Sequence, residues 1–303
     1  MNTRRAIGID IGGTKISLAV VNDTGQIEAQ TRLPTEAQRG FQDGIRRMAA
    51  AIHDLTRQVG LQTGNFAGIG IGCPGPLDPF TGVITTDYNL PSWGGCNILH
   101  AFRDLFGLPV RLENDADAAL VGEAHAGAGR DARAIVMLTF GTGVGGAALN
   151  DGHIYRGANG EHPEIGHIPI DPTGPECYCG LYGCLESLAS GAAIADAGRS
   201  SGFADSQDVF AKAASANPTA SLIVDRVIHA SASALWTLIH TFLPERVILG
   251  GGIMEEHYAL FEPAMNEVIT RSKLGPSKGM QLRKAQLLSK AGLVGAAFLA
   301  LRP

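Results

Sequence analysis

The chain has 303 residues, of which 45% are hydrophobic, and a formal net charge of −5. A chain of this length can bury one large core or two smaller ones, and two domains of ordinary size are favoured. The weakly acidic composition lacks the basic surface typical of nucleic-acid binders, so we expect no nucleic-acid partner.

The N-terminal segment predicts no export, because Arg4 and Arg5 are not followed by an apolar stretch of signal-peptide length with a cleavage site. The most apolar helical stretch, residues 232–243, is about a dozen residues long, which is too short to span a bilayer. We therefore expect a cytoplasmic protein without a membrane partner. Stable disulfides are rare in that compartment, so the five cysteines need another explanation.

The first elements form a β-meander. Residues 6–33 are predicted as three antiparallel strands joined by turns at Gly12 and Gly25. Residues 41–59 carry apolar side chains at spacings of three and four, which predicts a helix with one buried face. Residues 66–73 then form a buried strand that ends before Pro74.

The meander pattern recurs from Ala134. Gly141 lies 129 residues after Gly12, and Gly152 lies 127 residues after Gly25. This nearly constant offset predicts a duplicated architecture with two related lobes. Chance similarity of two glycine-containing hairpins remains the alternative.

The last third is mainly helical. An alanine-rich region ends at Pro244, a buried strand covers residues 247–249, and an apolar helix begins at residue 291. Because no low-complexity linker occurs, we expect the lobes to share a hinge.

Three glycine clusters follow predicted strands, at Asp10–Lys15, Phe140–Gly146 and Leu249–Ile253. Glycine allows backbone amides to approach an anion closely, and the first cluster adds a hydroxyl and an ammonium. Any one cluster is also explained by a tight hairpin. Together they predict two phosphate loops and a nucleotide contact.

An acidic cluster at residues 112–120 joins a short strand to a helix. Asn114 or Asp115 could be present only as the helix N-cap. The functional interpretation is that Asp115 is a general base that takes a proton from an attacking hydroxyl.

The middle of the chain carries one nitrogen and three sulfur ligands, the set typical of a closed tetrahedral zinc site: His167, Cys177, Cys179 and Cys184. A thioredoxin-type motif has two residues between its cysteines, whereas one separates Cys177 from Cys179. Free thiols are the alternative. We expect a structural ion.

Glu164, His167 and Glu186 flank this predicted metal site. Charged groups fixed by a metal could accept hydrogen bonds from several hydroxyls of a polyol. Solvated loop side chains are the competing interpretation.

These motifs, in this order, resemble the ROK family of sugar kinases, which belongs to the superfamily of hexokinase, actin and Hsp70. The similar segments are "DIGGTK", "GIGIGCPGP", "ENDADAA", "FGTGVGG", "EIGH", "CYCGLYGCLE" and "ILGGG". The resemblance implies an α/β, two-lobed actin-like ATPase (ribonuclease H-like) fold with an interlobe active-site cleft. Residues 1–115 and 292–303 would form a small N-terminal lobe, and residues 116–291 a large C-terminal lobe with the zinc-binding loop.

The resemblance also implies roles for individual residues. Asp10 would help to organise Mg²⁺, and Asp115 would be the catalytic base, with Asn114 beside it on the sugar. The other implied residues are the first phosphate loop of Gly12, Gly13, Thr14 and Lys15, the second phosphate loop of Gly141, Thr142 and Gly143, the adenosine contacts Gly250, Gly251 and Gly252, and the sugar contacts Gly75, Asn89, Glu164, His167 and Glu186. His167 would join Cys177, Cys179 and Cys184 on a structural Zn²⁺.

The implied activity is transfer of the γ-phosphate of ATP to the 6-hydroxyl of a hexose by a homodimer. Glucose is favoured, with fructose, mannose, N-acetylglucosamine and N-acetylmannosamine as rivals. His162 and Pro163 before Glu164 resemble ROK fructokinases, whereas the three cysteines resemble glucokinases and N-acetylhexosamine kinases. Asp117 and Gly146 depart from the usual pattern, in which an asparagine and a larger apolar residue are common.

A sugar-responsive ROK transcription regulator is the alternative from another class. Such regulators carry an N-terminal DNA-binding domain, for which we expect no room before Asp10.

Overall fold

The computed structural model describes residues 3–273 and 279–302. Contacts divide the chain into two compact units. The first comprises Met1–Asp131, Arg156–His162 and Ser289–Pro303, and the second comprises Ala132–Tyr155 and Pro163–Leu288. Residues 116–131 therefore group with the first unit, although we expected the large lobe to begin at residue 116.

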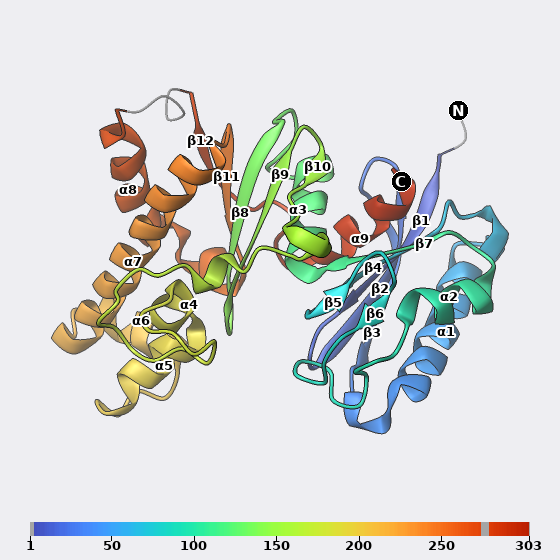
Figure 1. Cartoon of the computed structure of the whole chain (residues 1–303), viewed down its shortest axis with the longest axis horizontal. Coiled ribbons are helices and arrows are strands. Elements are labelled where there is room, and N and C mark those ends of the chain that lie inside the picture. Colours follow the sequence, from blue (N-terminus) through green and yellow to red (C-terminus); the bar gives the residue numbers. More distant parts are fainter. Residues whose placement is uncertain (1–2, 274–278, 303) are drawn as a thin grey trace. The chain divides into compact units, whose positions relative to one another are not determined.

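The first unit contains, within its described residues, a five-stranded sheet of order β3-β2-β1-β4-β7 (Figure 1). Its strands are β1 (Arg5–Ile11), β2 (Lys15–Asn22), β3 (Ile27–Pro34), β4 (Ile69–Cys73) and β7 (Val110–Asn114), and β5 (Leu77–Asp78) pairs separately with β6 (Val83–Ile84). The first three strands are antiparallel, which confirms the predicted meander, while β4 and β7 run parallel to β1.

Four α-helices of this unit flank the sheet: α1 (Phe41–Gln58), α2 (Ile98–Phe106), α3 (Asp115–Ala126) and α9 (Ala291–Leu301). Short 3₁₀ turns occur at η1 (Ala37–Arg39), η2 (Thr63–Asn65), η3 (Ala158–Gly160) and η6 (Leu288–Lys290). The predicted helix at 41–59 is confirmed, and its apolar residues Ile45, Met48 and Ile52 are buried.

Alternating isoleucine and glycine on β1 and β4 explains how helices cover both sheet faces. Side chains alternate between faces along a strand. Ile69 and Ile71 enter the core that includes residues of α1 and α2. A side chain at Gly70 would instead overlap the carbonyl oxygen of Ala296 in α9. The glycine face thus admits α9 at backbone-contact distance.

The second unit repeats the same topology, with a sheet of order β10-β9-β8-β11-β12 among its described residues (Figure 1). Its strands are β8 (Ala134–Phe140), β9 (Val144–Asn150), β10 (His153–Ile154), β11 (Arg246–Gly250) and β12 (Gln281–Lys284). The first three are antiparallel, and β11 and β12 run parallel to β8. The predicted duplication is therefore confirmed.

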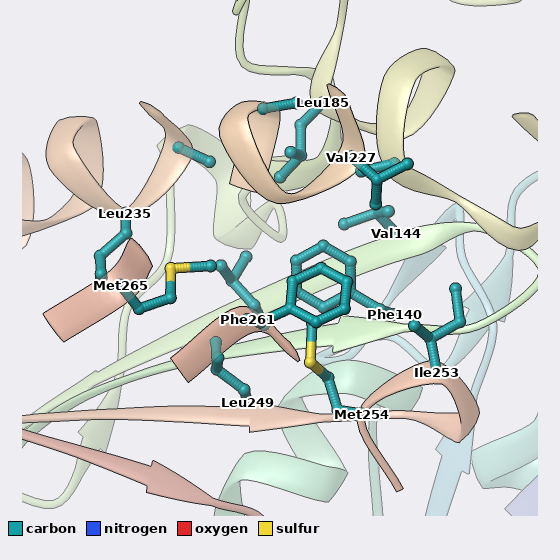
Figure 2. Close-up of a cluster of buried hydrophobic side chains, with 14 of the residues drawn as sticks. Phe140, Val144, Leu185, Val227, Leu235, Leu249, Ile253, Met254, Phe261 and Met265 are labelled. Carbon is teal, nitrogen blue, oxygen red and sulfur yellow. The ribbon is translucent and has the colours of Figure 1, made fainter. Parts of the chain in front are cut away.

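The helices of the second unit are η4 (Ile165–His167), α4 (Leu185–Ala189), α5 (Gly191–Arg199), α6 (Ser206–Ala214), α7 (Pro218–Phe242) and α8 (Gly252–Arg271). Figure 2 shows the apolar core that forms between the sheet and these helices. The rings of Phe140 from β8 and Phe261 from α8 lie 6.2 Å apart at its centre.

Helix α7 is longer than predicted. Its 25 residues begin after the N-cap Asn217 with Pro218 in the first turn and end at Phe242, followed by the C-cap Leu243 in the left-handed region before Pro244. By length and composition it is the one helix in the described part of the chain that could cross a membrane. The expected limit of a dozen residues was therefore wrong. Its most apolar window is 44% buried and contributes to the core of the second unit, which accounts for its composition.

Candidate active site

The carboxyl ends of β1, β4 and β7 place polar residues at one edge of the first sheet. Asp10 is in register with Gly72 on the neighbouring strand, and Cys73 is in register with Asn114 on the next. A Cβ on Gly72 would lie 3.8 Å from both Asp10 Oδ1 and Asp115 Cα. Parallel strands that end together at one edge form the usual position of ligand sites in α/β proteins.

Two carboxylates at this edge are shifted toward their neutral forms. Desolvation, and next the charge of Asp115, raises the pKa of Asp10 from 3.8 to about 6, against the opposing charges of Lys15 and Arg32. Desolvation also raises the pKa of Asp115, opposed by the N–H of Ala116 and the charge of His162. Asp115 is nevertheless exposed, so its carboxylate is open to an incoming group on one side.

The first glycine cluster forms the hairpin between β1 and β2. The N–H of Gly12 donates to the carbonyl of Lys15 at 2.9 Å. Buried Thr35 fixes the hairpin, because its hydroxyl donates to the carbonyl of Gly12 at 2.6 Å and its N–H to that of Thr14 at 2.9 Å. Gly13, Thr14 and Lys15 are exposed. Thr35 was not predicted as part of this loop, because it directly follows β3 and is far in the sequence from any glycine cluster.

Gly75, Asn89 and Asn114 are brought together in the first unit. Asn114 is the N-cap of α3, since its side-chain oxygen accepts the N–H of Ala116 at 2.8 Å. Its amide nitrogen points at Gly75, where a Cβ would lie 3.5 Å away. Asn89 donates to the carbonyl of Gly75 at 2.6 Å. The capping interpretation of Asn114 is therefore correct, and it leaves the amide nitrogen available.

The second glycine cluster, Gly141–Gly143, joins β8 to β9. Its first two carbonyls accept the N–H groups of Gly191 and Ala192 at the start of α5, at 2.8 and 3.2 Å. The carboxylate of Glu186 lies against Gly143, 2.7 Å from where a Cβ on that glycine would be.

The third cluster, Gly250–Gly252, joins β11 to α8. Gly251 has a φ of 85°, and a side chain there would overlap the backbone of Phe140. Gly252 faces open space, and α8 begins without a side-chain cap. A long helix with uncapped N–H groups favours an anion at this point.

The predicted zinc ligands converge in the second unit: the ligand atoms of His167, Cys177, Cys179 and Cys184 all lie within 4.8 Å of one another. Tetrahedral zinc with Zn–S near 2.3 Å and Zn–N near 2.05 Å has S···S edges of about 3.8 Å and S···N edges of about 3.6 Å. The structure has Cys179 Sγ–Cys184 Sγ at 3.6 Å and Cys177 Sγ–His167 Nδ1 at 3.4 Å. The donor set and its spacing fit Zn²⁺.

Glu186 and His167 lie on two segments that contact each other. Pro169 forms an isolated antiparallel bridge with Cys184, and the N–H of Leu185 donates to the carbonyl of Ile168 at 3.0 Å. Glu186 Oε2 accepts the N–H of Val144 at 2.8 Å and so contacts the second glycine cluster. His167 Nε2 lies 3.1 Å from the hydroxyl of Tyr178. Glu164, which is exposed, precedes the 3₁₀ turn that carries His167.

The structure also contains a charged cluster that was not predicted. Arg156 pairs with Glu113 and Asp117, and His162 Nδ1 lies 2.9 Å from Asp117 Oδ2. Asp117 and His162 had been noted in the sequence, but their separation of 45 residues gave no sign that they meet.

The departure at Gly146 has a packing explanation. A Cβ at this position would lie 2.8 Å from the Cβ of Ile165, whose side chain fills the space that a larger residue 146 would take.

Comparison with known proteins decides the family. The family model described as "ROK family" matches residues 6–302. The chain belongs to the ROK family. It is 35% identical to a glucokinase from Thermotoga maritima, covering 97% of this chain and 96% of that one. It is 33% identical to an N-acetylmannosamine kinase from Citrobacter koseri, covering 97% and 98%.

Among solved structures, the ROK family glucokinase from Streptomyces griseus in complex with glucose and AMPPNP is similar, with a TM-score of 0.79 and 29% identity over 99% of this chain and 100% of that one. This ROK protein therefore has the expected α/β, two-lobed actin-like ATPase fold.

Proposed function

We propose that this ROK protein is an ATP-dependent hexose kinase that transfers the γ-phosphate to the 6-hydroxyl of a hexose, with glucose favoured. The observation that carries the proposal is Asp115, an exposed carboxylate with a raised pKa that lies beside Asp10 at the carboxyl ends of the parallel strands β1, β4 and β7. The similarity to glucokinases supports it.

Asp115 is the proposed catalytic base. It stands at the first position of α3, where its Oδ1 accepts the N–H of Ala116 at 2.8 Å. That contact orients the carboxylate and leaves Oδ2 to take the proton of the sugar hydroxyl as its oxygen attacks phosphorus. Such assistance typically contributes about 10² to 10⁴ in rate.

The phosphates of ATP are proposed to lie along the glycine clusters. Gly12, Gly13, Thr14 and Lys15 form the first loop, and Gly141, Thr142 and Gly143 form the second. Gly250–Gly252 lie on the adenosine side, where α8 begins without a side-chain cap. Asp10 is the residue that would hold Mg²⁺, which would supply positive charge to balance that of the transferring phosphoryl group.

Each unit contains residues that are proposed to contact the sugar. Gly75, Asn89 and Asn114 supply amide and backbone groups in the first unit. In the second, Glu164 and Glu186 supply carboxylate acceptors, and His167, whose Nδ1 faces the proposed Zn²⁺, would donate its Nε2–H. For His167, the sugar hydroxyl would share or replace the Tyr178 hydroxyl at Nε2.

We propose that His167, Cys177, Cys179 and Cys184 hold a structural Zn²⁺. Burial raises the pKa of Cys184 to about 12 in the metal-free site, so metal binding would displace its proton. The role of these residues is to fix the two segments that carry His167 and Glu186.

An N-acetylmannosamine or N-acetylglucosamine kinase is the second candidate, supported by the relative from Citrobacter koseri at 33% identity. A coupled ADP-release assay across glucose, fructose, mannose and the two N-acetylhexosamines, with the position of the product phosphate determined, separates these activities. No ADP release on any of these sugars, together with sequence-specific DNA binding, would favour a transcription regulator instead. The family resemblance also supports a homodimer in the cytoplasm, and light scattering of the purified protein measures its oligomeric state.

A further inference from the structure

The segment Arg156–His162 carries a basic side chain at each end, and both meet acidic side chains at the start of α3. Arg156 pairs with Glu113 at the end of β7 and with Asp117 in the first turn of α3. His162 Nδ1 lies 2.9 Å from the same oxygen of Asp117. By contacts this segment belongs to the first unit, although its chain neighbours on both sides belong to the second.

The cluster is buried. The side chain of Asp117 is fully buried, while those of Glu113, Arg156 and His162 are between 14% and 19% exposed. The second oxygen of Asp117, Oδ1, has no hydrogen-bond partner among the described residues. A buried carboxylate without compensating charge is strongly unfavourable, so Arg156 and His162 are what allow an aspartate at this position.

Members of the cluster flank the proposed base Asp115 in the sequence, and their charges shift its pKa. Glu113 and Asp117 lie two residues before and two residues after Asp115. The charge of His162 lowers the pKa of Asp115, and the charge of Asp117 raises it. The two partners of the 2.9 Å contact therefore act on the base with opposite signs.

The pairing also connects two features of the sequence that the proposed function leaves unused. Asp117 stands where the resemblance leads us to expect asparagine, and His162 precedes the segment with Glu164. Asparagine would carry no negative charge opposite the basic side chains of Arg156 and His162. The structure shows that these two unusual residues contact each other.

We propose that Asp117 and His162 are positioning residues, held in place by Arg156, which fix the first turn of α3 and so orient the base Asp115 that this turn carries. This inference rests on the proposed function, because the role of Asp115 as base belongs to it. Neither residue is assigned a contact with sugar or nucleotide.

The test compares His162→Ala with His162→Asn and with Glu161→Ala. Alanine removes the contact to Asp117, whereas the asparagine amide can place a donor near the position of Nδ1. Glu161 is an exposed neighbour in the same segment with no assigned role, and its replacement should leave kcat at the wild-type value. All variants are assayed for ADP release from ATP with glucose, or with the best substrate of the sugar screen, well below their unfolding midpoints.

We expect His162→Ala to lower kcat by about 10- to 100-fold, as a small misplacement of a reacting group does, with the KM for ATP within about twofold of wild type. We expect His162→Asn to recover at least a third of the wild-type kcat. A folded His162→Ala enzyme with wild-type kcat would overturn the proposal. A lowered unfolding midpoint with unchanged kcat would do the same, because it would reduce the cluster to a structural role.

If His162→Ala does not fold, Asp117→Asn replaces it, because an amide keeps the volume and the acceptor oxygen but removes the charge that holds His162. We expect its kcat to fall about tenfold in a folded protein, and a wild-type kcat would overturn the proposal. Asp115→Asn separates the two levels of the argument. If Asp115→Asn is inactive while His162→Ala is normal, only this inference fails; if Asp115→Asn is fully active, the proposed base is wrong.

Discussion

Gly143→Ala tests whether Glu186 links the second glycine cluster to the sugar. A Cβ at residue 143 would lie 2.7 Å from Glu186 Oε2 and 3.3 Å from its Cδ. The backbone of Gly143 is not in the left-handed region, so the substitution adds no backbone strain. The perturbation is therefore a direct clash with one carboxylate.

The size of the effect follows from the geometry. An ordinary contact needs at least 3.4 Å, so the carboxylate must retreat by about 0.7 Å. That movement stretches its 2.8 Å hydrogen bond with the N–H of Val144 toward about 3.5 Å, the outer limit for such a bond. The same movement would take the carboxylate of Glu186 away from the sugar hydroxyl whose hydrogen bond it is proposed to accept, and a hydrogen bond to a charged group contributes about 1.5 to 3 kcal/mol. Since about 1.4 kcal/mol corresponds to a factor of ten, we expect the KM for the sugar to rise about 10- to 100-fold.

The assay measures the KM for the sugar at saturating ATP, together with the unfolding midpoint. Gly141→Ala is the matched control, because a Cβ there meets nothing closer than 4.0 Å. We expect the control to keep the wild-type unfolding midpoint and sugar KM, whereas its KM for ATP is free to change. A Gly143→Ala enzyme with both wild-type sugar KM and wild-type unfolding midpoint would refute the reasoning.

Three further predictions concern the carboxylates and the metal. Asp115→Asn keeps an acceptor for the N–H of Ala116, so it should fold normally and lose about 10² to 10⁴ in kcat; near-normal turnover contradicts the base assignment. Cys179→Ser should contain no zinc by elemental analysis, and its sugar KM should rise about tenfold or more, because the metal fixes the segments that carry His167 and Glu186. The control Cys96→Ser should retain zinc. Wild-type protein that is zinc-free and active after chelation would contradict this prediction. The pKa of Asp10 is raised from 3.8 to about 6, so the contribution of this residue to the free energy of unfolding is fully present below pH 4 and is lost as the pH rises through 6. In urea unfolding without Mg²⁺, the free energy of unfolding of Asp10→Asn minus that of wild type should therefore increase by up to about 3 kcal/mol from pH 4 to pH 7. If this difference is the same at both pH values, the shift is contradicted.

Local patterns were sufficient to predict most of the fold. Periodicity predicted α1, and the turn residues predicted both meanders, because these signals arise from neighbours in the chain. The apolar stretch 232–243 covers only the C-terminal part of α7 and therefore underestimates the length of the helix. Its start signals, Asn217 and Pro218, stand in the sequence 14 or more residues earlier.

The site was predicted only in part, for a physical reason. The zinc ligands are close in the chain, so their chemistry and spacing already indicate a tetrahedral site. By contrast, the bond from Glu186 to Val144 spans 42 residues, and that between His162 and Asp117 spans 45. Such contacts depend on how the elements pack, which residue type and local spacing do not specify. Asn114 shows a further limit, since one side chain caps a helix and also presents its amide to Gly75.

The position of α9 has a consequence for synthesis on the ribosome. The helix covers the glycine face of β1 and β4, yet its residues are made after those of the whole second unit. Domains commonly fold in the order in which they emerge. Until α9 is synthesised, the part of this face at Gly8 and Gly70 stays uncovered in the nascent first unit, although α3 already contacts Gly72. By then the second unit has all its residues. We therefore expect the unit that begins the chain to be the last to complete its fold.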